Sequence, residues 1–260
     1  MKFLKRFLVM VAVAFFGAVL SFFGWVYLKH VTPILMYHHV ELSDHDEADK
    51  VNPEVFDRQM SAIKEFGYKT LSMEEYMALR LAGKKVPRKD IVITFDDGYE
   101  DNYTQAFPIL KKYGHTATIF LHVEKIGTPG YLTWEEIKEM QQHGIFFGSH
   151  SLTHPHLPSF SEKEQRWELS ESKRILEEKL GHSIEFVAYP AGAFNEATKR
   201  AAKDAGYKAG LTTNRGYVLD NSDFFELKRV RLSNSDVNKL YIWVKIAGYS
   251  NVFRKGEKPS

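Results

Sequence analysis

The sequence predicts an α/β protein, a distorted (β/α) barrel of about seven parallel strands preceded by one N-terminal transmembrane helix. Three observations predict this fold. Strand-like and helix-like segments alternate from Ile34 onward, polar residues recur where strands end, and a long uncharged run lies near the N-terminus. Seven or eight strand–helix units in about 230 residues favour a barrel over an open sheet. With 44% hydrophobic residues, the chain can bury one sizeable core.

The strands and helices expected from the pattern are these. Strands cover Ile34–Tyr37, Ile91–Phe95, Thr116–Val123, Ile145–Gly148, Glu185–Tyr189, Ala209–Thr213 and Leu227–Leu232, and helices cover Asn52–Phe66, a segment opened by Ser72, Asn102–Tyr113, Trp134–His143, Glu162–Leu180 and Glu196–Ala205. Capping boxes at Ser72 and Thr133 mark two of the helix starts.

Residues 1–31 are expected to form a membrane anchor or a signal peptide, and residues 32–260 the globular domain. Basic residues precede the uncharged run Phe7–Leu28, which can cross about 30 Å of hydrocarbon as a helix. Trp25 and Tyr27 suit a membrane interface, and the end of the run, Gly24–Leu28, lacks a small-x-small cleavage site, which favours the anchor. The basic end then stays in the cytoplasm, and the domain is extracytoplasmic. Cleavage of a signal peptide would instead make the protein secreted.

Composition excludes several other functions. The net charge is +2 and no basic patch is interleaved with aromatic residues, so nucleic acid is not an expected partner. The chain contains no cysteine, which excludes disulfides and a thiol nucleophile. Histidine, aspartate and glutamate remain as the metal ligands to expect, and no protein partner is indicated.

The segment Thr94–Gly98, with Asp96 and Asp97 side by side, ends a predicted strand. Side chains alternate along a strand, so two adjacent carboxylates separate in function only if the chain turns, which Gly98 permits. One carboxylate can then bind a metal while the other acts as a base. The alternative is an ordinary turn.

A second polar element, His150 to His154, also follows an apolar strand. Alone, a His-x-x-x-His pair is more often a surface feature. However, His38 and Tyr189-Pro190 also lie at strand ends, and the carboxyl ends of parallel strands meet on one face. This convergence indicates a metal-hydrolase site.

These motifs resemble those of the polysaccharide deacetylases of carbohydrate esterase family 4, the NodB-homology domain. Thr94–Gly98 is similar to the first motif, His150-Ser151-x-x-His154 with Pro155-His156-Leu157 to the second, and Tyr189–Gly192 to a variant of the third. The resemblance covers roughly residues 33–232.

The resemblance implies that Asp97, His150 and His154 bind a divalent metal, usually zinc, with cobalt or nickel as alternatives. It implies that Asp96 is the catalytic base. Two imidazoles and one carboxylate leave open positions on zinc for water and substrate. A carboxylate can take the proton of a water whose pKa is lowered by the metal.

In the third motif, the resemblance places an oxyanion-stabilising backbone N–H at Ala191, with Tyr189 and Pro190 beside the substrate. The arginine that usually leads this motif and holds the catalytic Asp is replaced by Ala188. Arg229, on a late predicted strand, is expected to orient Asp96 instead.

The general acid of the family usually comes from a Leu-x-His motif, which is absent after Val230. Met36-Tyr37-His38 instead resembles the circularly permuted branch that includes the poly-N-acetylglucosamine deacetylases. His38 is therefore the expected acid, with His39 as a weaker candidate. A closed barrel tolerates such a permutation because its first and last strands are neighbours.

The expected function is metal-dependent removal of acetyl groups from N-acetylated sugars of an extracytoplasmic polysaccharide similar to poly-N-acetylglucosamine. The alternatives are a peptidoglycan or O-acetyl-ester deacetylase, and an anchored glycan-binding protein without catalysis, for which Ala188 leaves room. A phosphoesterase would call for arginine and glycine clusters that the sequence lacks. The charged residues of Glu162–Lys179 are expected to form a solvated helix face. Five further histidines are expected to be structural or on the surface: His115, His122, His143, His156 and His182.

Overall fold

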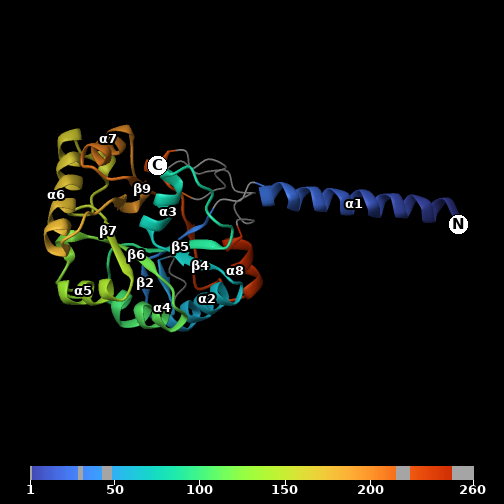
Figure 1. The fold of residues 1–260 in the computed structure, drawn as a ribbon, viewed down its shortest axis with the longest axis horizontal. Coiled ribbons are helices and arrows are strands. Elements are labelled where there is room, and N and C mark those ends of the chain that lie inside the picture. Colours follow the sequence, from blue (N-terminus) through green and yellow to red (C-terminus); the bar gives the residue numbers. More distant parts are fainter. Residues whose placement is uncertain (1, 29–31, 43–48, 215–222, 248–260) are drawn as a thin grey trace.

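The computed structural model describes residues 2–28, 32–42, 49–214 and 223–247. Its centre is an all-parallel sheet in the order β10-β1-β5-β6-β7-β8-β9, with β4 paired to the start of β5. The strands are β1 (Ile34–Tyr37), β4 (Lys69–Leu71), β5 (Asp90–Phe95), β6 (Ala117–Leu121), β7 (Ile145–Ser149), β8 (Phe186–Ala188), β9 (Ala209–Leu211) and β10 (Val230–Arg231). Helices surround this sheet (Figure 1).

The two ends of the sheet meet through the segment 227–231. Leu227 forms a parallel bridge with Leu211 at the end of β9, and three residues later β10 pairs with β1. One short segment therefore joins the last strand to the first. The predicted distorted barrel of about seven parallel strands is confirmed, although its final strand is shorter than Leu227–Leu232.

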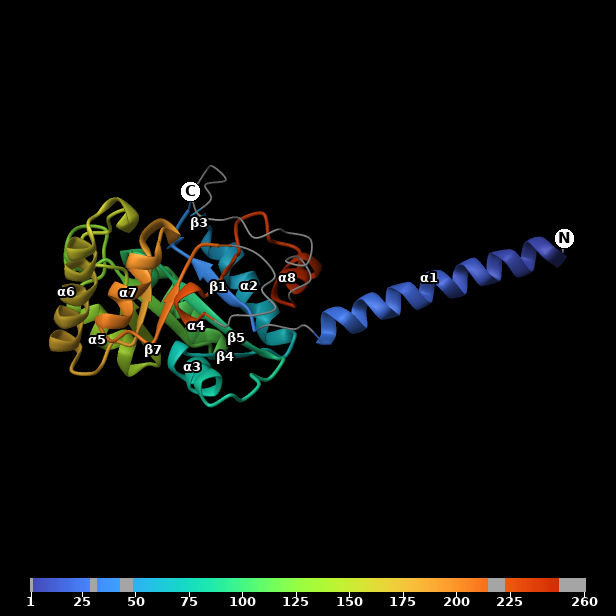
Figure 2. The same ribbon diagram turned by 90° about the horizontal axis from the view of Figure 1, so that it is seen from above.

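Figures 1 and 2 show the helices around the sheet, and those that were predicted begin and end within a residue or two of the expected positions when the π-helical turn before α4 is counted with that helix. They are α2 (Pro53–Glu65), α3 (Met73–Leu81), α4 (Phe107–Tyr113), α5 (Trp134–Gln142), α6 (Glu162–Leu180), α7 (Glu196–Asp204) and α8 (Lys239–Ile246). Both predicted capping boxes are present, with Ser72 and Thr133 accepting from the backbone of Glu75 and Glu136. Such caps satisfy amides that the first helical turn leaves without partners.

Several short elements were not predicted. β4 and the paired strands β2 (His39–Val40) and β3 (Lys50–Val51) contain two or three residues each, too few to show a period. α8 was also missed. The expected helix over Asn102–Tyr113 begins with a π-helical turn, Asn102–Ala106, a feature often found beside functional sites.

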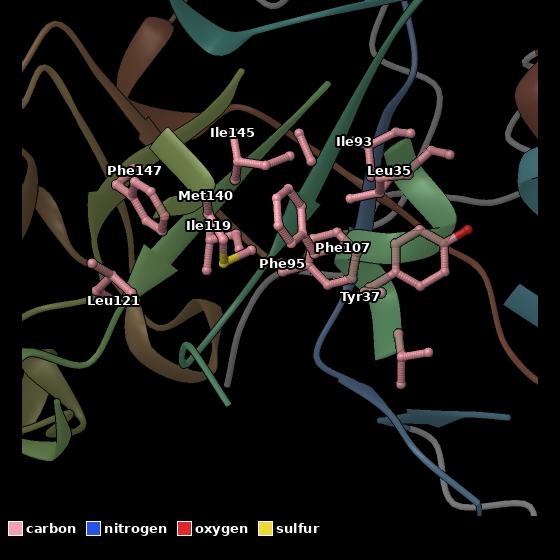
Figure 3. Packing of buried hydrophobic residues seen from close by; sticks show 14 of the residues in the cluster. Leu35, Tyr37, Ile93, Phe95, Phe107, Ile119, Leu121, Met140, Ile145 and Phe147 are labelled. Carbon is pink, nitrogen blue, oxygen red and sulfur yellow. The ribbon is translucent and has the colours of Figure 1, made fainter. Parts of the chain in front are cut away.

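The core lies between the sheet and the surrounding helices. In Figure 3, Leu35 and Tyr37 of β1 lie near Ile93 and Phe95 of β5, and the Tyr37 and Phe95 rings stack with centroids 5.4 Å apart. Tyr37 is 2% exposed, and its hydroxyl donates to Gln59 of α2. This packing fixes the carboxyl ends of β1 and β5, from which His38 and Asp96 follow.

The N-terminal helix α1 (Lys2–Leu28) stands apart from the barrel in both ribbon views. Its segment Phe3–Phe22 has a mean hydropathy of 2.1 and no buried residues, so its length and composition suffice to cross a membrane. The division into residues 1–31 and 32–260 agrees with the element bounds but stays a prediction.

Candidate active site

The two adjacent carboxylates separate where β5 ends. Asp96 continues the sheet, and its N–H donates to the Tyr37 carbonyl at 3.0 Å. Asp97 then adopts a left-handed conformation, with φ of 71°, which turns its side chain away from that of Asp96. Gly98 follows with φ of 74°, and a side chain there would lie only 2.7 Å from Leu121. The turn at Asp96–Gly98 therefore gives the two carboxylates different surroundings.

Asp96 forms a buried, bidentate ion pair with Arg229. Arg229 Nη1 lies 2.7 Å from Asp96 Oδ1, and Nη2 lies 2.6 Å from Oδ2. The guanidinium also donates to Thr94 Oγ1 and to the Thr212 carbonyl, and both charged side chains are about 1% exposed. The expected contact between Arg229 and Asp96 is present.

Burial of Asp96 would raise its pKa, but Arg229, with His150 and His38 nearby, holds the pKa well below its ordinary value. The carboxylate therefore stays ionised in the closed interior. Ala188, which stands where the family usually has an arginine, lies on β8. The cation that pairs with Asp96 is instead Arg229, from the segment after β9.

Asp97 contacts two histidines instead of a cation. Its Oδ1 lies 3.4 Å from His150 Nε2 and 3.3 Å from His154 Nε2. Two ligands each about 2.1 Å from a tetrahedral zinc ion would lie about 3.4 Å apart, so the spacing fits zinc. These three residues, which we call the Asp97 cluster, could hold a divalent metal.

The imidazole of His150 is fixed by its second nitrogen. His150 Nδ1 lies 2.7 Å from the Ala188 carbonyl, which can only accept a hydrogen bond. Nδ1 therefore donates this hydrogen bond, which leaves Nε2 as the ring nitrogen that faces Asp97. Metal-binding histidines are commonly oriented in this way.

The backbone is strained at this site. Within the described residues, the non-glycine residues with positive φ are Asp97, Ser151, His154 and Ala191. All four lie in the three motifs of the predicted site. Such conformations cost about 1–3 kcal/mol each and persist only where surrounding contacts enforce them. Their concentration here marks these loops as functional.

His38 lies beside Asp96, with Nε2 3.9 Å from Asp96 Oδ2. Burial lowers the pKa of His38, although Asp96 and Asp97 partly oppose this effect. The side chain of Asn102, in the π-helical turn, donates to the His38 carbonyl and fixes the local backbone. The position of His38 beside Asp96 is compatible with the expected general acid, whose role stays a prediction.

The third motif contains both buried and exposed residues. Tyr189 is fully buried, and its hydroxyl donates to the Phe225 carbonyl. The Tyr189 ring packs in the core against Phe194, and the expected place of Tyr189 beside the substrate stays a prediction. Pro190 is buried as well, whereas Ala191 is exposed in the left-handed turn that follows.

A second cluster, which we call the His39 cluster, comprises His39, Glu41 and Asp101. His39 Nδ1 lies 2.6 Å from Asp101 Oδ2, and Glu41 pairs with Lys50 at 2.9 Å. Burial opposes protonation of His39, but Asp101 raises the His39 pKa above its ordinary value. The cluster lines a cavity of about 690 Å³.

Two residues near the site have surroundings that the sequence did not predict. His122 was expected to be structural, yet its ring centroid lies 5.4 Å from that of His154, and burial with the two nearby imidazoles lowers its pKa to about 4. Glu168 was assigned to a solvated helix face, but it is 1% exposed. The signal was its spacing, since Glu168, Ser172 and Leu176 lie one turn apart on one buried stripe of α6.

The comparisons with known proteins agree with this geometry. The sequence model of the polysaccharide deacetylase family matches residues 83–210. The Bacillus subtilis protein YxkH, assigned to the polysaccharide deacetylases, is 38% identical over 201 residues, covering 77% of this chain and 71% of that protein. A poly-beta-1,6-N-acetyl-D-glucosamine N-deacetylase of Staphylococcus aureus is 30% identical over 201 residues, covering 71% of this chain and 68% of that protein.

Among solved structures, the Streptococcus pyogenes deacetylase PplD in complex with acetate superposes with a TM-score of 0.78 at 32% identity. The match covers 83% of this chain and 97% of PplD. The sequence and structure comparisons thus both identify deacetylases, and the chain belongs to the polysaccharide deacetylase family.

Proposed function

We propose that the protein is a metal-dependent N-deacetylase that removes acetyl groups from an extracytoplasmic polysaccharide similar to poly-N-acetylglucosamine. The observation that carries the proposal is the different pairing of two adjacent carboxylates. Asp96 is held by Arg229, whereas Asp97 faces His150 and His154 at the spacing of zinc ligands.

In this proposal, Asp97, His150 and His154 hold a zinc ion. The bound ion would supply a water of lowered pKa and would polarise the acetyl carbonyl. Asp96 takes a proton from the attacking water, because its carboxylate is ionised and held in place by Arg229. Fixing the base in advance reduces the cost of ordering it during the reaction.

As water adds to the acetyl carbon, the carbonyl oxygen becomes an oxyanion, and the backbone N–H of Ala191 donates to it. His38 donates a proton to the sugar nitrogen as the carbon–nitrogen bond breaks. Its buried position weakens its hold on a proton, which makes its protonated form a stronger acid. Acetate and a free amine are the products.

The polysaccharide and the location are supported separately. The Staphylococcus aureus relative is named for poly-beta-1,6-N-acetyl-D-glucosamine. The exposed apolar segment Phe3–Phe22 supports an anchor whose basic end stays in the cytoplasm, with the domain outside. A cleaved signal peptide remains the alternative for the same segment.

The direct test measures acetate released from poly-N-acetylglucosamine by the purified full chain in detergent. We expect release to stop with a chelator and to return with zinc, cobalt or nickel. Peptidoglycan and an O-acetylated glycan serve as competing substrates. No acetate from any of these substrates after metal addition would refute the enzyme, and preference for another substrate would replace the proposed polysaccharide.

Two variants separate the residue roles in the same assay. Asp96→Asn should abolish acetate release but leave zinc binding intact, because Asp96 is not a ligand in the proposal. His38→Gln should also lower turnover with zinc still bound. Loss of zinc from the Asp96→Asn protein would contradict the assignment of Asp97 alone as the carboxylate ligand.

A further inference from the structure

We infer that Glu168 is a positioning residue that holds the loop Ser151–His154 in its metal-binding conformation. This inference rests on the proposed function, since it concerns how the Asp97 cluster is preformed for a metal. Glu168 lies on α6, which contributes no residue to that cluster.

Glu168 accepts three hydrogen bonds from two consecutive residues of the loop. Its Oε2 accepts from the backbone N–H groups of Leu152 and Thr153, both at 3.0 Å, and its Oε1 accepts from Thr153 Oγ1 at 2.6 Å. The residue is 1% exposed. An acceptor-only carboxylate suits these three donors, since neither oxygen has to donate.

The loop needs such support because it is strained on both sides of these contacts. Ser151 has φ of 65° and His154 has φ of 57°, both left-handed conformations that side chains disfavour. Glu168 binds the two residues between them. Ser151 Oγ in turn accepts from the His154 N–H at 3.0 Å. The carboxylate thus enforces a conformation that the loop sequence does not favour on its own.

The next turn of α6 supports the start of the same loop. Ser172 Oγ lies 2.8 Å from Ser149 Oγ, which accepts from the Ser151 N–H at 3.2 Å. Glu168 and Ser172 are four residues apart and therefore lie on one helix face. The buried face of α6 therefore supports the start of the loop through Ser149 and its middle through Leu152 and Thr153. His150 and His154 consequently approach Asp97 before a metal binds.

The test compares Glu168→Gln with Glu178→Gln, which removes an exposed carboxylate from the same helix. Glutamine keeps the shape of Glu168, but its NH₂ group must replace one acceptor oxygen facing the loop. We expect zinc affinity, measured by competition with a chromophoric chelator, to fall about 10- to 100-fold in Glu168→Gln. Glu178→Gln should bind zinc as the wild type does.

Two further readouts distinguish positioning from general stability. Acetate release by Glu168→Gln should recover when the zinc concentration exceeds the weakened Kd of this variant. The absorption spectrum of cobalt bound to Glu168→Gln should differ from that of cobalt bound to the wild type, because the ligand geometry is altered. If Glu168→Gln fails to fold by circular dichroism, Thr153→Ala decides the question, because it removes only the 2.6 Å bond. Thr153→Ala should then weaken zinc binding in a folded protein.

The outcomes separate the inference from the proposed function. Wild-type protein that binds no metal would overturn the proposed function. Wild-type protein that binds zinc, together with folded Glu168→Gln and Thr153→Ala proteins of unchanged zinc affinity, would overturn the positioning role alone.

Discussion

The Asp97 cluster and the His39 cluster contain similar residues but differ in how their charges are paired. In the Asp97 cluster, one carboxylate faces two imidazole nitrogens at 3.3 and 3.4 Å. In the His39 cluster, His39 is bonded to Asp101 at 2.6 Å and Glu41 pairs with Lys50. The His39 cluster therefore already satisfies its own charges, and a metal would have to displace those partners.

The backbone separates the clusters as well. Asp97 and His154 both have positive φ, whereas His39 lies in a short regular strand pair. Strain of this kind persists where a site requires a specific geometry. Proximity of histidines and carboxylates is thus a weak criterion for a metal site, and a carboxylate that faces imidazole nitrogens at ligand spacing on a strained backbone is a stronger one.

The largest effect is expected for His150→Ala. Removing one of three ligands should abolish stable zinc binding, and with it several kcal/mol of transition-state stabilisation, or about a thousandfold in kcat/KM. Zinc content by elemental analysis and acetate release would measure both effects. A variant that retains one zinc ion and more than about a tenth of its activity would mean that the metal lies elsewhere.

The carboxylate of Asp96, adjacent to Asp97 in the chain, is paired with the guanidinium of Arg229, unlike that of Asp97. Arg229→Met leaves a buried carboxylate without its partner and should lower the free energy of unfolding by about 3–5 kcal/mol. Urea unfolding of the metal-free protein would measure this loss. The double variant Asp96→Asn/Arg229→Met should recover part of it. A loss below about 1 kcal/mol for Arg229→Met would show that another group compensates Asp96.

This pair also shows how far the sequence allowed prediction. Regular strand and helix patterns predicted β1, β5, β7 and α6 within a residue or two, and the strand ends located Asp96, Asp97 and His150. The family resemblance showed that the usual arginine is replaced by Ala188, and Arg229 was the expected substitute because it lies on a late predicted strand. Local pattern was sufficient for the strands and their ends, whereas the partner of Asp96 required the resemblance.

Other features depend on tertiary contacts that no local pattern encodes. The direction of the Tyr189 ring is set by packing against Phe194, and the burial of Glu168 is set by the loop Ser151–His154, which donates hydrogen bonds to its carboxylate. An acidic residue within a charged helix is usually solvated, so composition favoured the wrong environment for Glu168. Strands of two or three residues, such as β3, arise from pairing and lack a sequence period.

A pH dependence should follow from the Asp96 pair. The folded pKa of Asp96 lies below its ordinary value of 3.8, so the unfolded state takes up the proton first as pH falls. The stabilisation is complete well above pH 4 and is lost progressively below that pH. Unfolding free energies of the metal-free protein at several pH values should therefore fall more steeply for the wild type than for Asp96→Asn. Parallel curves for the two proteins would contradict the shifted pKa.

The smallest effect is expected for His39→Ala. Because the His39 cluster has its own internal partners, removing this imidazole should leave one zinc ion per chain and change kcat/KM by less than about tenfold. Some loss is still expected, since the His39 ring stacks on Tyr99 with centroids 3.5 Å apart, and Tyr99 lies two residues after Asp97. Elemental analysis of wild type and variant would count the metal. Two zinc ions in the wild type and one in His39→Ala would make the His39 cluster a second metal site and would remove the distinction based on charge pairing.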